Sequence, residues 1–259
     1  MRFARLGSPG ALPPIVLAHG YPDDLQIFSR LAPLLAHGRE VLAFDWPGMG
    51  ESEEWHGGAS PTHMAERLVR LLDAWEIERV HVAGIDMGGQ PAIIAASRFP
   101  TRIAALTVSN SLVAVDAQTS WEIQLLRKVG LNRLAIRSAP RIVFARAERT
   151  FLPASDRLDP ETRSELWTCF RQRAVRRYVS RMCTAYSGAL SHLADHFARI
   201  GCPTHVLWGS AEKHFPLAHA EQLHAAIPGA VLTVIEGGQH WMCWHRAQDV
   251  AAAIVSRGV

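Results

Sequence analysis

The sequence predicts an α/β fold in which a mostly parallel central sheet is flanked by helices and carries an inserted helical cap. Two observations lead to this prediction. Short apolar runs bounded by Gly, Pro or Asp alternate with segments of helical periodicity, and the alternation stops in the middle of the chain, where the sequence becomes mainly helical. Alternation of strands and helices places helices over both faces of a parallel sheet. The chain has 259 residues, 48% of them hydrophobic, which is enough to bury a large core.

The predicted strands are short and apolar throughout, as strands buried on both faces are. They span residues 14–18, 40–44, 80–84, 105–109, 204–208 and 231–235. Helical periodicity is clearest over residues 62–75, where Met64, Leu68, Leu71, Leu72 and Trp75 fall on one face. Further helices are predicted over 90–98, 219–227 and 248–255.

The interruption after Asn110 predicts the cap. Helices are expected over 121–131 and 161–185, which places the cap at 115–193 and a discontinuous core domain at 1–114 and 194–259. Residues 114–190 hold fourteen Lys or Arg and seven Asp or Glu. This basic excess is interpreted either as a solvated surface or as a region that attracts an anionic substrate or a carrier protein.

Composition excludes several classes of protein. The net charge of +3 gives no case for binding nucleic acid or a membrane, and no apolar run reaches the length of a membrane span. The N-terminal residues lack the apolar stretch of a secretory signal, and the four cysteines are scattered, so we expect a reducing cytoplasm. No H-E-x-x-H or C-x-x-C pattern occurs, so a metal site is not expected. The chemistry of the motifs described below requires no organic cofactor. The oligomeric state is left open.

The strongest chemical signal is Gly84-Ile85-Asp86-Met87-Gly88-Gly89, which follows a predicted strand and opens a predicted helix. This is the pattern of a nucleophile elbow with Asp in place of the usual Ser. The glycines suit a tight turn whose backbone crowds its neighbours. The helix N-terminus favours a charged carboxylate at Asp86.

A predicted oxyanion hole faces this elbow. His19-Gly20-Tyr21-Pro22 ends the first predicted strand, and the backbone N–H groups of Tyr21 and Met87 are placed to bind an oxyanion. The segment around Asp45-Trp46-Pro47-Gly48 supports this interpretation, because it matches the turn expected after the next strand.

A carboxylate and an imidazole follow the last two predicted strands. Glu212 comes a few residues after 204–208, where it can hold an imidazole in one tautomer. His240 follows 231–235 and two glycines. The chain order nucleophile, acid, histidine favours a catalytic triad of Asp86, Glu212 and His240.

With these motifs the sequence resembles the α/β-hydrolase superfamily over essentially its full length, and its aspartate nucleophile resembles the epoxide hydrolase and haloalkane dehalogenase branch. The resemblance implies that Asp86 forms an alkyl ester, which a water activated by His240 then cleaves. The order of steps is chemically sound, because a carboxylate can displace at an sp3 carbon and its ester can then be hydrolysed.

The leaving group distinguishes the two activities. Haloalkane dehalogenases usually carry Trp after the nucleophile and many carry Asn after His-Gly, where this chain has Met87 and Tyr21. His-Gly-aromatic-Pro is similar to the epoxide hydrolase pattern, which also places two tyrosines in the cap. Tyr178 and Tyr186, about two helical turns apart, are therefore the predicted acids for the epoxide oxygen. Predicted substrate contacts are His19, Trp46, Trp121, Trp167 and Trp241.

Two alternatives remain at this point. The first is a dehalogenase of haloalkanes or haloacids in which Trp121, Trp167 or Trp241 binds the halide. The second is a lyase, cyclase or isomerase in which Asp86 is a general acid or base and no ester forms. The expected partner in every case is a small-molecule substrate.

Overall fold

The computed structural model describes residues 1–114, 118–127 and 131–256, and the side chains of all of these except 125–127, 131–133, 186, 187 and 189. Its described strands form a seven-stranded sheet in the order β1-β3-β2-β4-β5-β6-β7. Only the β1–β3 pair among them is antiparallel. The strands are β1 (Phe3–Leu6), β2 (Ile15–Ala18), β3 (Val41–Phe44), β4 (Val80–Ile85), β5 (Ile103–Ser109), β6 (Thr204–Gly209) and β7 (Val231–Ile235). The predicted fold class is confirmed.

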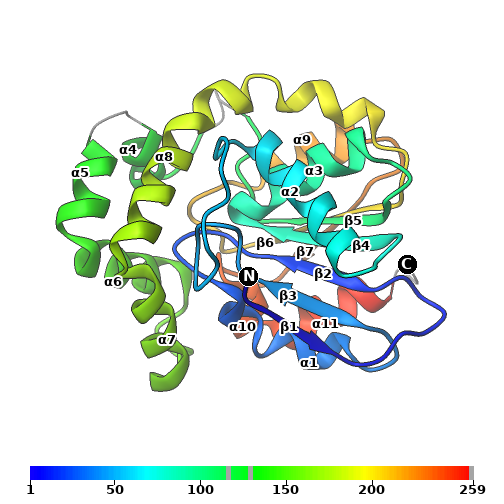
Figure 1. Ribbon diagram of the computed structural model, residues 1–259, viewed down its shortest axis with the longest axis horizontal. Helices are drawn as coiled ribbons and strands as arrows, with labels where there is room; N and C mark the ends of the chain where they lie inside the picture. Colours follow the sequence, from blue (N-terminus) through cyan, green and yellow to red (C-terminus); the bar gives the residue numbers. More distant parts are fainter. Residues whose placement is uncertain (115–117, 128–130, 257–259) are drawn as a thin grey trace.

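Helices cover both faces of this sheet (Figure 1). On one face lie α2 (Pro61–Ala74), α3 (Gly89–Arg98) and α9 (Ala218–Ala226), and on the other α1 (Leu31–Leu35), α10 (Met242–His245) and α11 (Ala247–Val255). Short 3-10 helices are η1 (Leu25–Phe28), η2 (Asp86–Gly88) and η3 (Leu193–Arg199). The residues at the start of α2 explain why this helix begins there. The Ser60 side chain accepts a hydrogen bond from the His63 N–H, and Pro61 occupies the first turn, where no N–H is needed.

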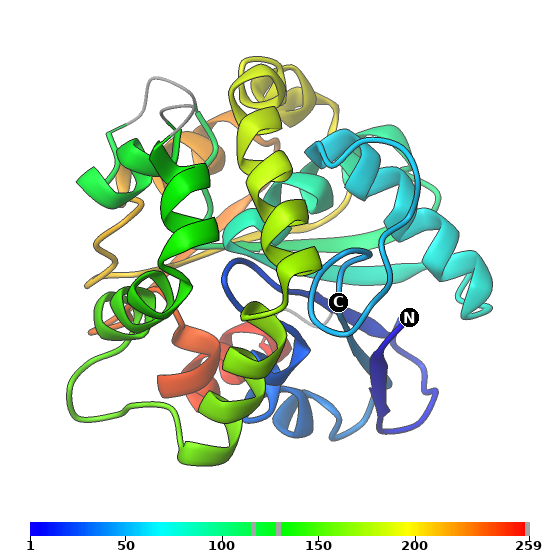
Figure 2. The same ribbon diagram turned by 60° about the vertical axis from the view of Figure 1, so that its left-hand side comes forward.

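The chain between β5 and β6 forms a group of helices beside the sheet (Figures 1 and 2). They are α4 (Trp121–Arg127), α5 (Leu131–Ser138), α6 (Pro140–Phe151), α7 (Pro160–Phe170) and α8 (Arg173–Leu190). The single helix expected over 161–185 is instead two helices, because the chain turns at Arg171 and Gln172. The predicted domain limits at 115 and 193 stay predictions, and residue 115 lies outside the described residues.

Strand β1 was not predicted. Its four residues alternate between exposed and half-buried, with Arg5 among them, so they lack the continuous apolar run of the inner strands. By contrast, every residue of β2 and β3 is buried. In the described part of the chain, no helix has both the length and the apolar character needed to cross a bilayer.

Candidate active site

The elbow lies between β4 and α3 and holds Asp86 in a left-handed conformation, with φ +48°. This backbone region is unfavourable for residues other than glycine and often marks functional positions. The turn is packed so closely against its neighbours that a side chain on either of two glycines would clash. A Cβ atom on Gly88 would lie 2.2 Å from the Ala18 carbonyl oxygen, and one on Gly20 would lie 2.5 Å from the Asp86 Cβ. The glycines therefore let the β2 turn approach the carboxylate.

Two backbone N–H groups stabilise the charged form of the Asp86 carboxylate. The Tyr21 N–H donates to Oδ2 at 2.9 Å, and the N–H of the next residue, Met87, favours the charge on the same side chain. Burial raises the pKa of Asp86, while the nearby His240 and these two N–H groups oppose the rise. The predicted positions of Tyr21 and Met87 therefore meet at one carboxylate, where their N–H groups can also bind an oxyanion formed from it.

His240 and Glu212 form a buried pair next to Asp86. The His240 Nδ1 lies 2.8 Å from the Glu212 Oε2, and its Nε2 lies 3.9 Å from the Asp86 Oδ1. The backbone N–H groups of His214 and Phe215 donate to the other Glu212 oxygen, at 2.6 and 3.3 Å. Burial alone would lower the pKa of His240, but Glu212 and Asp86 raise it to about 9. Burial likewise opposes the charge on Glu212, yet His240 holds the pKa of this carboxyl below its usual value.

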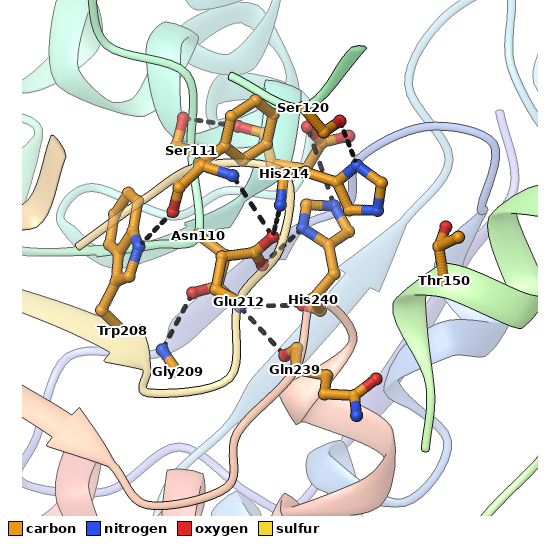
Figure 3. A network of polar contacts seen from close by, with 12 residues as sticks. Asn110, Ser111, Ser120, Thr150, Trp208, Gly209, Glu212, His214, Gln239 and His240 are labelled. Atoms are coloured by element: carbon orange, nitrogen blue, oxygen red, sulfur yellow. Dashed lines mark hydrogen bonds and ion pairs between the residues drawn. The ribbon is translucent and has the colours of Figure 1, made fainter. Parts of the chain in front are cut away.

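Asn110, which the sequence reasoning missed as a site residue, fixes the loop that carries His240 (Figure 3). Its side-chain N–H2 donates to the carbonyl oxygens of Gln239 and His240 at 3.1 and 3.0 Å, and its oxygen accepts from the Gly209 N–H. Asn110 follows β5 at the same sheet edge, with φ +42°. A polar residue directly after a buried strand was the available signal.

A mostly apolar cavity of about 250 Å³ has Asp86 in its wall. Most of the described wall comes from the helices between β5 and β6, chiefly α6 and α4. Phe151 joins this wall to the loop that carries His240, because its ring lies 4.1 Å from the His240 ring and its carbonyl accepts from the Trp241 N–H. Apolar lining residues include Leu112, Ile142, Val143, Ala147, Phe151, Met182 and Phe215.

His214 lines the cavity and is a second site residue that the sequence reasoning missed. Its Nδ1 lies 2.8 Å from the Ser120 Oγ, while its Nε2 is buried and has no hydrogen-bond partner among the described residues. Burial, helped by the nearby His240, lowers the pKa of His214 to about 4. The ring is therefore neutral at pH 7 and carries an unused polar atom in a residue that lines the cavity. The available signal was its position in the sequence, two residues after Glu212.

The structure does not place Tyr178 in the cavity wall. Tyr178 is fully buried, and its hydroxyl accepts a hydrogen bond from the Arg67 guanidinium at 2.9 Å. Its ring lies so close to Gly48 that a Cβ there would be 2.5 Å away. Tyr178 therefore joins α8 to the core, and its predicted role as an acid is corrected. The side chain of Tyr186 lies outside the described residues.

Some of the predicted substrate contacts line the cavity and others do not. Trp121 lines the cavity. His19 and Trp46 instead bind each other: the Trp46 N–H donates to the His19 Nε2 at 3.2 Å, and the indole N–H donates to the His19 carbonyl at 3.0 Å. They join the ends of β2 and β3 and so support the oxyanion turn, which corrects their predicted contact with substrate.

Trp167 and Trp241 are also absent from the described cavity wall. The Trp167 ring packs on Phe144, and the Trp241 ring packs edge-on against Phe151. Both are corrected as direct substrate contacts. The described residues hold no cluster of three or more His, Cys, Asp or Glu side chains suited to a metal ion.

Comparison with known proteins gives matches that cover most of this chain. A family model described as the alpha/beta hydrolase fold matches residues 13–247. A 2-hydroxy-6-oxononadienedioate/2-hydroxy-6-oxononatrienedioate hydrolase from Cupriavidus pinatubonensis is 29% identical over 241 residues, which cover 88% of this chain and 79% of that protein.

Two further proteins show the range of the likeness. The dihydrolipoyllysine-residue acetyltransferase component of the acetoin cleaving system from Pseudomonas putida is 26% identical over 96% of this chain, but the chain spans only 64% of that protein's length. A mutant of a proposed epoxide hydrolase from Pseudomonas aeruginosa superimposes with a TM-score of 0.85 at 22% identity, covering 98% of this chain and 90% of the other. At this identity the likeness shows the fold alone.

Proposed function

Because the chain belongs to the alpha/beta hydrolase fold family, we propose that it is a hydrolase that acts through a covalent alkyl ester on Asp86, with an epoxide as its substrate. One observation carries the proposal: the residue at the elbow is a carboxylate in the wall of an apolar cavity, with an imidazole 3.9 Å away. A carboxylate is suited to attack an sp3 carbon, and its product ester needs a base for hydrolysis.

In the first half-reaction, an Asp86 oxygen attacks an epoxide carbon and the C–O bond of the ring breaks. The apolar wall supports this step, since it removes water that would otherwise solvate the nucleophile. The nearby cationic His240 helps to keep Asp86 ionised despite its burial.

In the second half-reaction, His240 takes a proton from a water that attacks the ester carbonyl. Formation of the ester removes the negative charge of Asp86, which is one of the groups that raise the pKa of His240. The imidazole therefore releases its proton more readily in the ester than in the free enzyme. The Glu212 Oε2 lies 2.8 Å from the His240 Nδ1 and so fixes the tautomer of the ring. The Tyr21 and Met87 N–H groups bind the tetrahedral oxyanion.

The cavity favours an uncharged, largely apolar epoxide over the anionic substrate that the basic cap suggested. Arg146 lines the cavity, but its guanidinium is bound to Glu122, which lines it too. The charge of this arginine is therefore already neutralised within the wall. The dehalogenase alternative is weaker for a similar reason, because Trp121 alone of its three proposed halide donors lies in the described wall.

The test is to trap the ester with styrene oxide as probe. His240→Asn should accumulate an adduct, found by mass spectrometry on the peptide that contains Asp86, while Asp86→Asn should form none. His224→Asn, which alters an exposed histidine on α9, is the matched control and should turn over without accumulating ester. Turnover by Asp86→Asn at more than background would instead favour a lyase, cyclase or isomerase.

A further inference from the structure

The proposed ring opening needs a proton donor, and the described cavity offers a narrow choice. An epoxide oxygen leaves as a developing alkoxide, so a protonated group must lie near the carbon that Asp86 attacks. Tyr178 is committed to Arg67 outside the cavity wall. Among the described lining residues, Tyr21 and His214 carry buried polar side-chain atoms without a hydrogen-bond partner.

Tyr21 is bound directly to the nucleophile. Its backbone N–H donates to the Asp86 Oδ2 at 2.9 Å, and its side chain lines the same cavity as the carboxylate. The ring packs edge-on against Phe170 at 5.7 Å, which holds the phenol in place. The residue is only 8% exposed. A buried hydroxyl without a partner lowers stability, so its presence here calls for a ligand that uses it.

The pKa values of Tyr21 and His214 distinguish the two residues as proton donors. The Tyr21 hydroxyl is influenced by Cys183 and by Asp86, and burial raises its pKa well above the usual value, so the phenol keeps its proton until a strong base forms beside it. Burial lowers the pKa of His214 to about 4, so its ring is neutral at pH 7 and is a weak proton donor. Its Nδ1 lies 2.8 Å from the Ser120 Oγ, whereas the Tyr21 backbone N–H binds the nucleophile itself.

We propose that the Tyr21 hydroxyl donates the proton to the epoxide oxygen while Asp86 opens the ring. This assignment rests on the proposed function. One residue then serves both half-reactions, with its O–H acting in alkylation and its backbone N–H acting in hydrolysis.

The protons balance over the cycle. The Asp86 oxygen forms a bond to carbon, the ring C–O bond breaks, and the Tyr21 proton passes to the released oxygen, leaving a phenolate. The phenolate then takes the proton that the cationic His240 carries in the free enzyme. Water loses one proton to the now neutral His240 and adds to the ester carbonyl. His240 returns that proton to the departing alcohol oxygen. The second water proton, left on the Asp86 carboxyl, restores the cationic His240, and the sum is epoxide plus water to diol.

The experiment changes each of the three tyrosines of the chain to Phe in the His240→Asn background, where ester accumulates, and follows adduct formation with styrene oxide. Tyr21→Phe keeps the ring and the backbone N–H. It should lower the saturating alkylation rate by on the order of 100-fold or more, the usual contribution of a general acid, while the half-saturating concentration changes less than about threefold. Its melting temperature should equal or exceed that of the parent.

Other results would overturn the assignment. An unchanged alkylation rate in Tyr21→Phe, or a loss confined to Tyr178→Phe or Tyr186→Phe, would place the acid elsewhere. A change in half-saturating concentration alone would make Tyr21 a packing residue. Failure of the proposed function looks different, because the His240→Asn parent would then form no adduct on Asp86 at all.

Discussion

Replacement of Asp23 by Asn should stabilise the protein, and increasingly so as the pH rises. Asp23 is buried beside the oxyanion turn, where Oδ2 accepts a 3.3 Å hydrogen bond from the Gly20 N–H and Oδ1 has no partner among the described residues. Burial, reinforced by the charge of Asp86, raises the pKa of Asp23 from 3.8 to about 8. The folded protein therefore keeps this proton up to about pH 8, whereas the unfolded chain loses it near pH 4.

The sign and size of the effect follow from that difference. Because the folded state holds the extra proton, this group's contribution is fully present below about pH 4 and is lost as the pH rises to about 8. Each pH unit in this window costs about 1.4 kcal/mol, so the cost reaches roughly 4 kcal/mol at pH 7. Asn does not titrate and should avoid most of this cost.

Urea unfolding at pH 5, 6, 7 and 8 measures the effect. The gain in unfolding free energy of Asp23→Asn over the parent should grow with each step. Asp249→Asn, at an exposed carboxylate, is the control and should show no such trend. A gain that is constant with pH, or a loss at pH 8, would refute the idea that Asp23 is neutral in the folded enzyme.

Three further changes follow from the same geometry. Glu212→Gln removes the charge that does most to raise the pKa of His240, so ester hydrolysis in rapid-mixing assays should slow by on the order of 10²- to 10⁴-fold; normal hydrolysis would exclude the pair from catalysis. Gly20→Ala places a Cβ 2.5 Å from that of Asp86, and should abolish adduct formation and cost about 1–3 kcal/mol in calorimetry; an adduct at the parental rate would contradict the crowded turn. Arg67→Met should cost about 2–4 kcal/mol in urea unfolding, because buried acceptors that Arg67 satisfies lose their donor; a change under about 0.5 kcal/mol would show that this contact does not hold α8.

The sequence was sufficient for the parts of the site that follow buried strands. Asp86 comes directly after a strand of a parallel sheet, while Glu212 and His240 follow their strands by three and five residues, and the carboxyl ends of such strands meet at one edge. Strand recognition and chain order therefore brought these three side chains together. The turn after β2 obeyed the same rule.

The residues of the helices between β5 and β6 could not be predicted as well, because tertiary packing decides which face of a helix points inward. On α8, Cys183 and Met182 line the cavity, while Tyr178 turns toward Gly48 and Arg67. Helical spacing alone does not distinguish these faces, since both are buried. The break between α7 and α8 escaped notice for a related reason, as neither Gly nor Pro marks it.

The roles of His19 and Trp46 could not be predicted from the sequence for a different reason. His19 and Trp46 follow neighbouring strands, as substrate contacts often do, yet each satisfies the other's polar atoms. A sequence shows that two polar groups lie at the same edge of the sheet, but it does not show whether they face the pocket or each other.

The most direct test of the central claim, that the Asp86 oxygen bonds to carbon, is a single turnover in water enriched in ¹⁸O with enzyme in excess over styrene oxide. Attack of water on the ester carbonyl predicts heavy oxygen in the peptide that contains Asp86 and none in the diol of the first turnover. Heavy oxygen found in that first diol, with an unlabelled peptide, would mean that water attacks the epoxide directly and would contradict the account.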